Sequence, residues 1–432
     1  MSSRARASSP GAPDHPAGPG SASAFWAVAA AMVLTLAAGG APSPLYVDYQ
    51  ARWHFSSATL TVIYALYAGG VIITLLFTGG LSDRVGRRPV LLGGMAALMV
   101  SLLVFLVADG AAWLGAARLL QGLATGTFTG AAGAALAELH PRRDSRIAAL
   151  VNSTSMSIGI AVGALGAGAL AEWAPWPLHT PYLLLMVITV ALFTVIAIRV
   201  PETVPTRCRP LLSTLLRPQR ISIPARMRKE FVTGCLGVLA ACSAAGLYLG
   251  LGGSLAKELL HADNHVVAGL VILAVQGVGG LAQLGFSAMS ARVASLLGCA
   301  ALIVGMFVVT TSNMISSAAL FLLGSVITGI GFGLAFMGTT RLVTQAAPAD
   351  QRGQVLAAYF VVAYLAISVP VIGAGVVSVQ IGLSATFYLF AGVVSLIALT
   401  TLVSTLMARR IGRAQQSRAT IVVGAHCPRW RP

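Results

Sequence analysis

Twelve long apolar runs, separated by short segments, constrain the fold of this chain more than any other feature. The runs cover residues 24–46, 58–80, 89–108, 113–138, 147–170, 180–200, 230–252, 265–287, 292–310, 315–339, 354–379 and 385–406. About 20 apolar residues form a helix that spans the hydrocarbon core of a bilayer. Only 9% of the 432 residues are charged, against about a quarter in soluble domains. The sequence therefore predicts an all-α integral membrane protein with twelve transmembrane helices.

The basic residues predict the orientation of these helices. If the N-terminus is cytoplasmic, 25 of the 28 Lys and Arg residues lie in cytoplasmic segments. Arg52 and Lys257 lie outside, and Arg118 lies within a helix. Cytoplasmic loops carry an excess of Lys and Arg, so we expect both termini to be cytoplasmic in a multi-pass protein of the plasma or inner membrane. The net charge of +16 would suggest nucleic acid in a soluble protein, but its place in membrane loops argues against such a partner.

The chain divides in the middle into two parts of nearly equal length. Residues 201–229 form the longest internal loop, a predicted cytoplasmic linker between six runs in 24–200 and six in 230–406. The loops before the fifth and eleventh runs share the order Pro, Asp, Arg, as Pro141, Asp144 and Arg146 and as Pro348, Asp350 and Arg352. This weak repeat predicts two pseudo-symmetric six-helix bundles, an organisation known among transporters.

Both ends of the chain are predicted to be cytoplasmic tails. Residues 1–23 are rich in Ser, Ala, Pro and Gly and predict a disordered cytoplasmic tail. Arg4 and Arg6 before an apolar run also resemble a signal peptide, with Ala37, Ala38 and Gly39 as cleavage context. The eleven further apolar runs favour a retained first helix. Residues 407–432 are predicted to be a basic cytoplasmic tail.

The loop between the second and third runs carries the most specific motif. It contains Gly79, Asp83, Arg84, Gly86, Arg87 and Arg88, followed by Pro89. Gly86 permits a tight turn, and Pro89 suits the first turn of a helix. The spacing resembles the signature loop of the major facilitator superfamily. That resemblance implies two six-helix bundles that rock about a central site, and a switch in which Asp83 latches the bundles near helix 11. The alternative is a turn that only sets topology.

A second motif lies in the fourth run, where Arg118 is followed by Gln121 and Gly122. It resembles the helix 4 motif of drug/proton antiporters of this superfamily, in which the Arg is implicated in proton coupling. An ionisable residue inside a membrane helix is a functional candidate by default. Arg118 lies only five residues from Trp113, however, so it could instead extend to the interface. Asp48, at the end of the first run, is a candidate partner and coupling residue.

Small residues dominate the fifth run, where Gly159, Gly163 and Gly168 partly match the antiporter motif of helix 5. Ala164 stands where that motif has proline, and Ala167 replaces a glycine. Glycines at this spacing let helices approach closely, which predicts a packing role. The missing proline weakens the resemblance to antiporters.

Neutral polar residues within the runs predict a mostly apolar substrate cavity, although each could instead bond two helices together. The candidates are Tyr64, Tyr67, Thr125, Asn152, Ser155, Gln276, Gln283, Tyr364 and Ser368, besides Gln121. All twelve acidic residues lie in tails, loops or helix ends. Proton coupling commonly uses a buried carboxylate, so Asp48, Glu138 and Glu230 are the remaining candidates, unless the substrate gradient alone drives transport.

These features predict a transporter and not an enzyme, because the runs lack the ionisable groups that intramembrane catalysis needs. We expect export of a drug-like or amphipathic molecule, with or without proton antiport. The alternative is uptake or facilitated diffusion of a small metabolite such as a sugar or organic acid. We expect no cofactor other than a proton gradient, no metal site, and a monomer whose partners are its substrate and the bilayer. A sensor would usually need a soluble output domain, which the tail is too short to supply.

Overall fold

The computed structural model describes residues 22–78, 81–142, 144–202, 223–260, 265–348 and 351–425, and within these ranges every element is helical. The first half contains α1 (Ala22–Gly40), α2 (Tyr46–Trp53), α3 (Ser57–Thr78), α4 (Leu81–Val85), α5 (Arg87–Leu106), α6 (Ala111–Leu139), α7 (Ser145–Trp173) and α8 (Thr180–Arg199), with a 3₁₀ turn, η1 (Ser43–Leu45). The second half contains η2 (Ala225–Met227), α10 (Arg228–Leu260), α11 (His265–Ile272), the π-helical η3 (Leu273–Gly277), α12 (Val278–Gly285), α13 (Ala291–Met314), α14 (Ala318–Ala346), α15 (Arg352–Ile381) and α16 (Leu383–Ala425).

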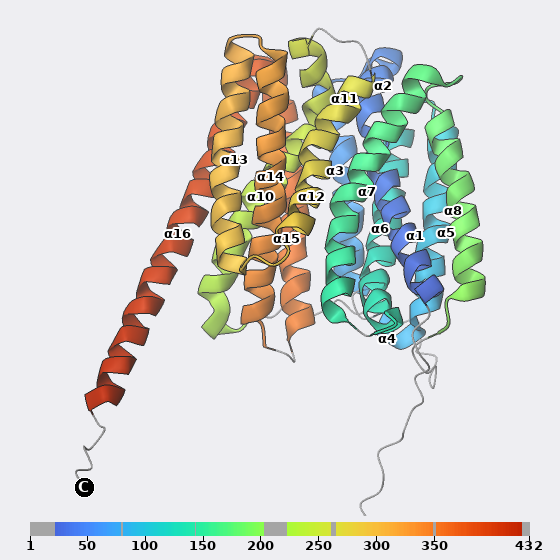
Figure 1. The fold of residues 1–432 in the computed structure, drawn as a ribbon. Helices are drawn as coiled ribbons and strands as arrows, with labels where there is room; N and C mark the ends of the chain where they lie inside the picture. Colours follow the sequence, from blue (N-terminus) through green and yellow to red (C-terminus); the bar gives the residue numbers. More distant parts are fainter. Residues whose placement is uncertain are drawn as a thin grey trace, which may run out of the picture.

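The helices are apolar enough to cross a bilayer, as the sequence predicts. In the described ranges, eleven spans qualify by length and hydropathy. The twelfth span is α6, which has 29 residues and includes Arg118, Gln121 and Glu138. It runs the length of the first bundle (Figure 1). The prediction of an all-α membrane fold with twelve spans is confirmed.

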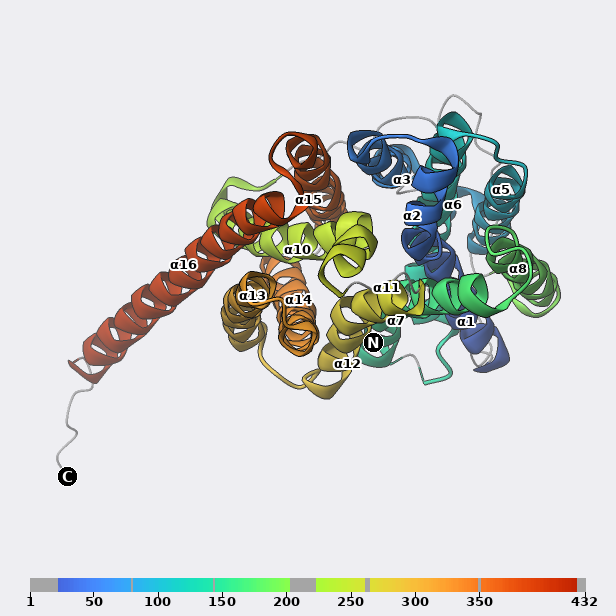
Figure 2. The ribbon, with the colours of Figure 1, turned by 90° about the horizontal axis from the view of Figure 1, so that it is seen from above.

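Two six-helix bundles stand side by side, and Figure 2 shows them as two groups of helices seen from above. The main contacts between them are those of α3 with α15 and of α7 with α11, η3 and α12. Two pairs of corresponding helices match in length: α6 and α14 each have 29 residues, and α7 and α15 have 29 and 30. The structure thus has the internal repeat that transporters of this architecture share.

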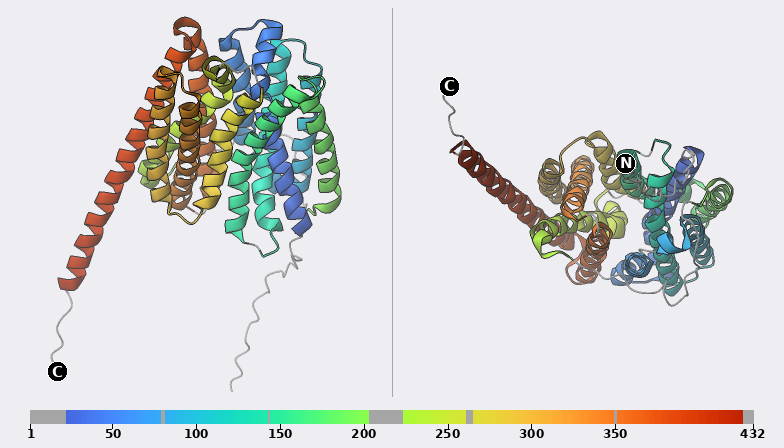
Figure 3. Two further views of the ribbon diagram at one scale, coloured as in Figure 1. Left: turned by 45° about the horizontal axis from the view of Figure 1, so that its top comes forward. Right: turned by 90° about the horizontal axis from the view of Figure 1, so that it is seen from below.

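The two ends of the bundles differ in chemistry. One end, here called the basic end, carries residues 81–88, 140–142, 199–202 and 286–292, and lies at the bottom of Figure 1. The other, here called the opposite end, carries residues 46–56, 107–110, 173–180 and 314–317. The oblique view in Figure 3 shows the same two ends and the long α16 leaving the second bundle at the basic end.

Three helices depart from the continuous runs that hydropathy predicts. The run 24–46 is not one helix: α1 stops at Gly40, because Pro42 and Pro44 cannot continue its hydrogen bonding, and a separate helix, α2, starts at Tyr46. The eighth span has a π segment, η3, between α11 and α12. The last helix continues to Ala425, beyond the apolar run that ends at residue 406.

Candidate functional site

Arg118 and Gln121 together hold the end of α1. The Arg118 Nη1 atom donates hydrogen bonds to the Gly39 carbonyl oxygen at 2.9 Å and to Gln121 Oε1 at 2.6 Å. Gln121 Nε2 donates to the carbonyl of Ala38 at 2.8 Å. The last carbonyls of a helix have no intrahelical donor, and a cation beside them also interacts favourably with the helix dipole. The break in α1 is therefore stabilised from α6.

The guanidinium of Arg118 also lies over two aromatic rings. Its central carbon is 4.5 Å from the centre of the Tyr67 ring and 5.6 Å from that of Tyr64, both on α3. Arg118 is 1% exposed, so it does not reach the membrane interface, and the alternative that it extends there is not supported. A buried cation held by carbonyl oxygens and ring faces is placed to interact electrostatically with a bound molecule.

The expected pairing of Arg118 with Asp48 is not found. Asp48 lies on α2, beyond the break that follows α1, and its Oδ2 atom is 2.8 Å from His265 Nε2. Glu172, at the end of α7, contacts the other ring nitrogen of His265: its Oε2 atom is 3.0 Å from Nδ1. This cluster of three ionisable side chains joins the two bundles at the opposite end, and sequence reasoning did not identify His265 or Glu172.

A cavity of about 50 Å³ lies between the two bundles beside Arg118. Each bundle supplies seven of the residues that line this central cavity: Leu36, Gly39, Tyr64, Tyr67, Arg118, Met156 and Ile160 from the first, and Cys242, Leu249, Phe336, Phe360, Ala363, Tyr364 and Ile367 from the second. The wall is mostly apolar, with one cation and three tyrosines. Sites for drug-sized ligands usually enclose about 300–1,000 Å³, so the bundles must separate further to admit such a molecule.

Some polar residues predicted to face a cavity do not line this one. Gln121 is committed to α1, Gln283 Nε2 donates to Ser157 Oγ at 3.3 Å across the bundle interface, and Ser368 Oγ donates to the Tyr364 carbonyl at 2.9 Å. The others away from the wall are Thr125, Asn152, Ser155 and Gln276, of which Thr125, Ser155 and Gln276 are buried. Of the predicted cavity residues, Tyr64, Tyr67 and Tyr364 line the central cavity, and Arg118 lies beside them.

The signature loop is held by two carboxylates from other helices. Glu202, just after α8, accepts hydrogen bonds from the backbone N–H groups of Arg87 at 2.9 Å and Arg88 at 3.2 Å, and so caps the N-terminus of α5. Gly86 has φ of +111°, a backbone conformation that favours glycine, and the Glu202 carboxylate lies against its Cα. The Arg87 guanidinium pairs with Glu138 of α6 at 3.1 Å.

The signature loop also contains the short helix α4. Asp83 and Arg84 lie on the backbone of α4, but their side chains, like residue Gly79, fall outside the described structure. The switch role of Asp83 therefore stays a prediction. Sequence reasoning missed Glu202 as the cap of α5, because its position directly after an apolar run suggested only a loop.

The three glycines of α7 lie at close helix contacts. A Cβ on Gly159 would meet the Val33 carbonyl at 2.7 Å, and one on Gly163 would meet the Ala37 carbonyl at 1.9 Å, both on α1. A Cβ on Gly168 would meet the His265 carbonyl at 2.5 Å, across the bundle interface. Such separations exclude any side chain, which agrees with the packing role that the spacing predicts.

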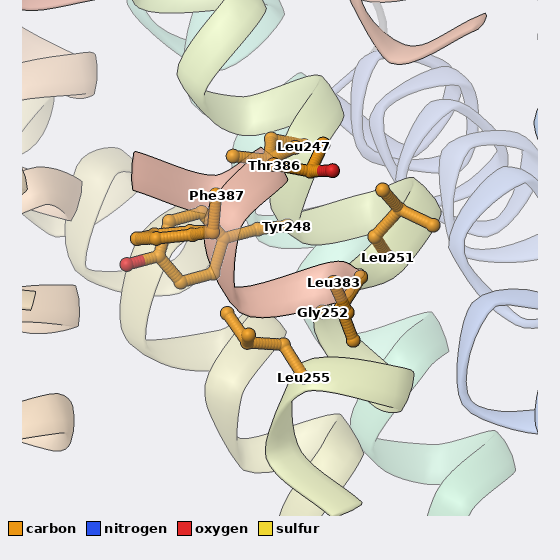
Figure 4. Close-up of a pocket in the computed structure, with 8 residues that line it drawn as sticks. All are labelled: Leu247, Tyr248, Leu251, Gly252, Leu255, Leu383, Thr386 and Phe387. Carbon is orange, nitrogen blue, oxygen red and sulfur yellow. The ribbon is translucent and has the colours of Figure 1, made fainter. Parts of the chain in front are cut away.

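A second hollow lies within the second bundle at the opposite end, between α10 and the start of α16 (Figure 4). Its volume is about 10 Å³, and Tyr248 and Phe387 close one side of it with their rings. A single water needs roughly 10–15 Å³, so this hollow is a packing gap and not a ligand site.

Comparisons with known proteins agree with this architecture. The sequence pattern of the Major Facilitator Superfamily matches residues 27–370. Two solved structures share the fold: the human organic anion transporter MFSD10 (TETRAN), with a TM-score of 0.66, 17% identity and coverage of 89% of this chain and 99% of that one, and a variant of the nucleoside transporter NupG, with a TM-score of 0.70, 11% identity and coverage of 88% and 99%.

Among curated proteins, the chain is similar to parts of proteins named Multidrug resistance protein MdtL. The Citrobacter koseri protein is 29% identical over 167 residues, which are 38% of this chain and 41% of that protein. An Escherichia coli protein is 32% identical over 112 residues, which are 26% of this chain and 29% of that protein. The match therefore spans less than half the length of these relatives.

Proposed function

Because the chain belongs to the Major Facilitator Superfamily, and so is a membrane transporter and not an enzyme, we propose that it exports a drug-like or amphipathic small molecule by alternating access. The observation that carries this proposal is the central cavity, which both bundles line and which combines apolar side chains with one buried cation. The similarity to parts of multidrug resistance proteins supports export.

The chemistry of the cavity wall favours a particular class of substrate. Phe336, Phe360 and Ile367 offer apolar and aromatic contact, and the Arg118 guanidinium offers hydrogen-bond donors. A cationic molecule would be repelled by Arg118, and a polyanion would need more buried cations than the wall provides. The substrate we propose is therefore neutral or amphipathic, with an aromatic body and a hydrogen-bond acceptor.

The orientation and cycle follow from the two ends of the molecule. We propose that the basic end faces the cytoplasm, since basic loops stay inside, and that the opposite end faces outward in the plasma or inner membrane. The bundles would open alternately at these ends around the central cavity. The Asp83 loop would stabilise the closed cytoplasmic end. We propose that a monomer suffices, with a proton gradient as the energy source and no bound cofactor.

Transport of a defined probe would test this proposal. The protein is expressed in bacterial cells, and inside-out membrane vesicles are given radiolabelled chloramphenicol, a neutral amphipathic aromatic molecule. Export corresponds to accumulation within these vesicles. We expect accumulation that exceeds that of vesicles without the protein, and that falls when nigericin collapses the pH gradient.

Two outcomes would favour another function. Accumulation that is indifferent to the pH gradient would favour facilitated diffusion over antiport. Transport of radiolabelled glucose, with none of chloramphenicol, would favour uptake of a small metabolite, a function that the altered glycine motif of α7 keeps as the second candidate. The matched control is the Arg118→Met variant at equal abundance.

A further inference from the structure

The polar cluster that joins the bundles at the opposite end is organised around one histidine. His265 is the first residue of α11 in the second bundle, whereas Asp48 on α2 and Glu172 on α7 belong to the first. The Nε2 atom of His265 lies 2.8 Å from Asp48 Oδ2, and Nδ1 lies 3.0 Å from Glu172 Oε2. The backbone N–H of His265 also donates to Glu172 Oε2 at 3.2 Å. Three hydrogen bonds thus hold the bundles together at this point.

The hydrogen-bond pattern specifies the charge on the ring. An ionised carboxylate can only accept hydrogen bonds, whereas a neutral imidazole has one donor and one acceptor nitrogen. Both ring nitrogens of His265 face carboxylate oxygens, so with both carboxylates ionised the two bonds form only when each nitrogen carries a proton. The contacts are therefore those of an imidazolium between two carboxylates.

From this geometry we propose that His265 is a proton-binding site that closes the outer end of the transporter. Its side chain is 23% exposed, and those of Asp48 and Glu172 are 31% and 28% exposed, so protons from outside can reach it. When His265 loses its proton, one ring nitrogen becomes an acceptor facing a carboxylate, and that bond becomes a repulsion. The closed outer end is then weakened.

The other charged groups near His265 lie on the elements packed around α11. Besides Asp48, α2 carries Arg52, which is exposed, and α7 contributes Glu172, whereas η1 has no charged residue. The last turn of α10 carries Lys257 and Glu258, and the connection to α11 includes His261 and Asp263. The side chains of these four lie outside the described structure, so the test must separate their titration from that of His265.

The sign of the expected pH effect follows from linkage. Protonated His265 bonds to Asp48 and Glu172 only in the closed state. The closed population should therefore be highest at low pH and should fall as the pH rises. Histidine ordinarily changes charge between about pH 5 and 8. A charge-assisted hydrogen bond at a partly exposed site should shift the ratio of closed to open molecules by roughly three- to tenfold across this range.

Distances between spin labels on the full-length chain in lipid nanodiscs would test the proposal. The native cysteines are replaced, and labels are placed at Asp109 in the first bundle and Met314 in the second, both exposed at the opposite end. We expect the short-distance population to fall between pH 5.5 and 8.5. His265→Gln should abolish this response, and His265→Arg, which keeps its charge, should hold the short distance at every pH.

Two controls make the result decisive. His179→Gln, at a second histidine of the same end, should keep the wild-type response. A label pair within the first bundle, at Asp109 and Trp176, should show one distance in every variant, which establishes that the fold is intact. A pH-independent wild type, or a response that persists in His265→Gln, would overturn the proposal and assign the effect to a neighbouring group.

The inference rests on alternating access and on the orientation, which are parts of the proposed function, but not on export or on the substrate. The label distances report the outer end without any substrate present. A protein that fails to transport chloramphenicol but shows the His265-dependent response would contradict the proposed substrate and leave the proton site intact. The reverse result would contradict the proton site alone.

Discussion

The two halves of the molecule repeat the same helices but not the same chemistry. The eighth residue of α6 is Arg118, which holds the carbonyls at the end of α1. The eighth residue of α14 is Ser325, whose Oγ lies 3.2 Å from the Tyr248 hydroxyl of α10. In the first half α1 stops at Gly40, whereas α10 continues unbroken for 33 residues. The buried cation therefore accompanies a broken helix, and the neutral pair accompanies a continuous one.

This difference indicates that the two halves share their helix packing but differ in their functional side chains. Close packing through small residues is needed in both halves, since either bundle must stay intact while the two move. A buried charge and an interrupted helix occur where α1, α3 and α6 meet, on the first-half side of the central cavity. The second half contributes Phe336, Phe360 and other apolar surface. We expect substitutions in the first half to change the rate of transport, and those in the second to change the range of substrates.

The strongest test of this asymmetry compares Arg118 with Ser325. Arg118→Met removes two hydrogen bonds of a charged group, each worth about 1.5–3 kcal/mol, and should lower the transport rate at least about a hundredfold. Arg118→Lys should recover only part of the transport rate, because lysine keeps the charge but lacks the planar fork. Ser325→Ala should change the rate less than about threefold. Equal losses in the two halves, measured as vesicle flux at matched protein abundance, would remove the asymmetry.

Glycine substitutions should show where the halves are alike. A Cβ on Gly163 would meet the Ala37 carbonyl at 1.9 Å, and one on Gly333 would meet the Gly279 carbonyl at 2.1 Å. Gly163→Ala and Gly333→Ala should each cost about 1–3 kcal/mol of stability, seen as a lower midpoint of thermal unfolding in detergent. Gly166→Ala is the control, because nothing lies within 4 Å of its Cβ. A tolerant Gly333 would mean that packing is also asymmetric.

Aromatic substitutions across the central cavity should separate affinity from substrate range. Tyr67→Leu removes the ring that lies 4.5 Å from the Arg118 guanidinium, an interaction worth about 0.5–2 kcal/mol. The concentration of chloramphenicol that gives half-maximal flux should rise about two- to thirtyfold. Phe360→Leu should leave that concentration within about twofold and instead admit bulkier molecules. If Phe360→Leu has the larger effect on affinity, the second half carries the binding energy.

The smallest expected effect concerns the third membrane span of each half, α5 in the first and α13 in the second. Glu202→Gln keeps an acceptor for the N-terminus of α5 but loses the charge, which should cost about 0.3–1 kcal/mol of stability. The corresponding helix α13 starts after Ser290, whose side chain makes no capping bond, so Ser290→Ala should leave the thermal midpoint unchanged. A midpoint that falls only in Ser290→Ala would contradict the described cap.

The membrane fold could be predicted from the sequence because hydropathy and charge counts depend on local composition alone. The contacts of the site could not, because they join residues far apart in the chain. Glu172 and Asp48 are 93 and 217 positions from His265, and Glu202 is 115 positions from Arg87. Arg118 and Gln121 were identified as a pair. Their partners are backbone carbonyls that lack an intrahelical donor because Pro42 and Pro44 interrupt α1. No side-chain pattern in the sequence indicates a backbone acceptor.

The central claim is that one cavity, lined by both halves, carries the transported molecule. Purified protein in liposomes, given radiolabelled chloramphenicol, tests it most directly when wild type is compared with Ala363→Trp, which fills the cavity from the second half. We predict flux above that of empty liposomes for the wild type and background flux for Ala363→Trp, with both proteins eluting as one folded species. Equal flux in the wild type and the filled variant would contradict the claim.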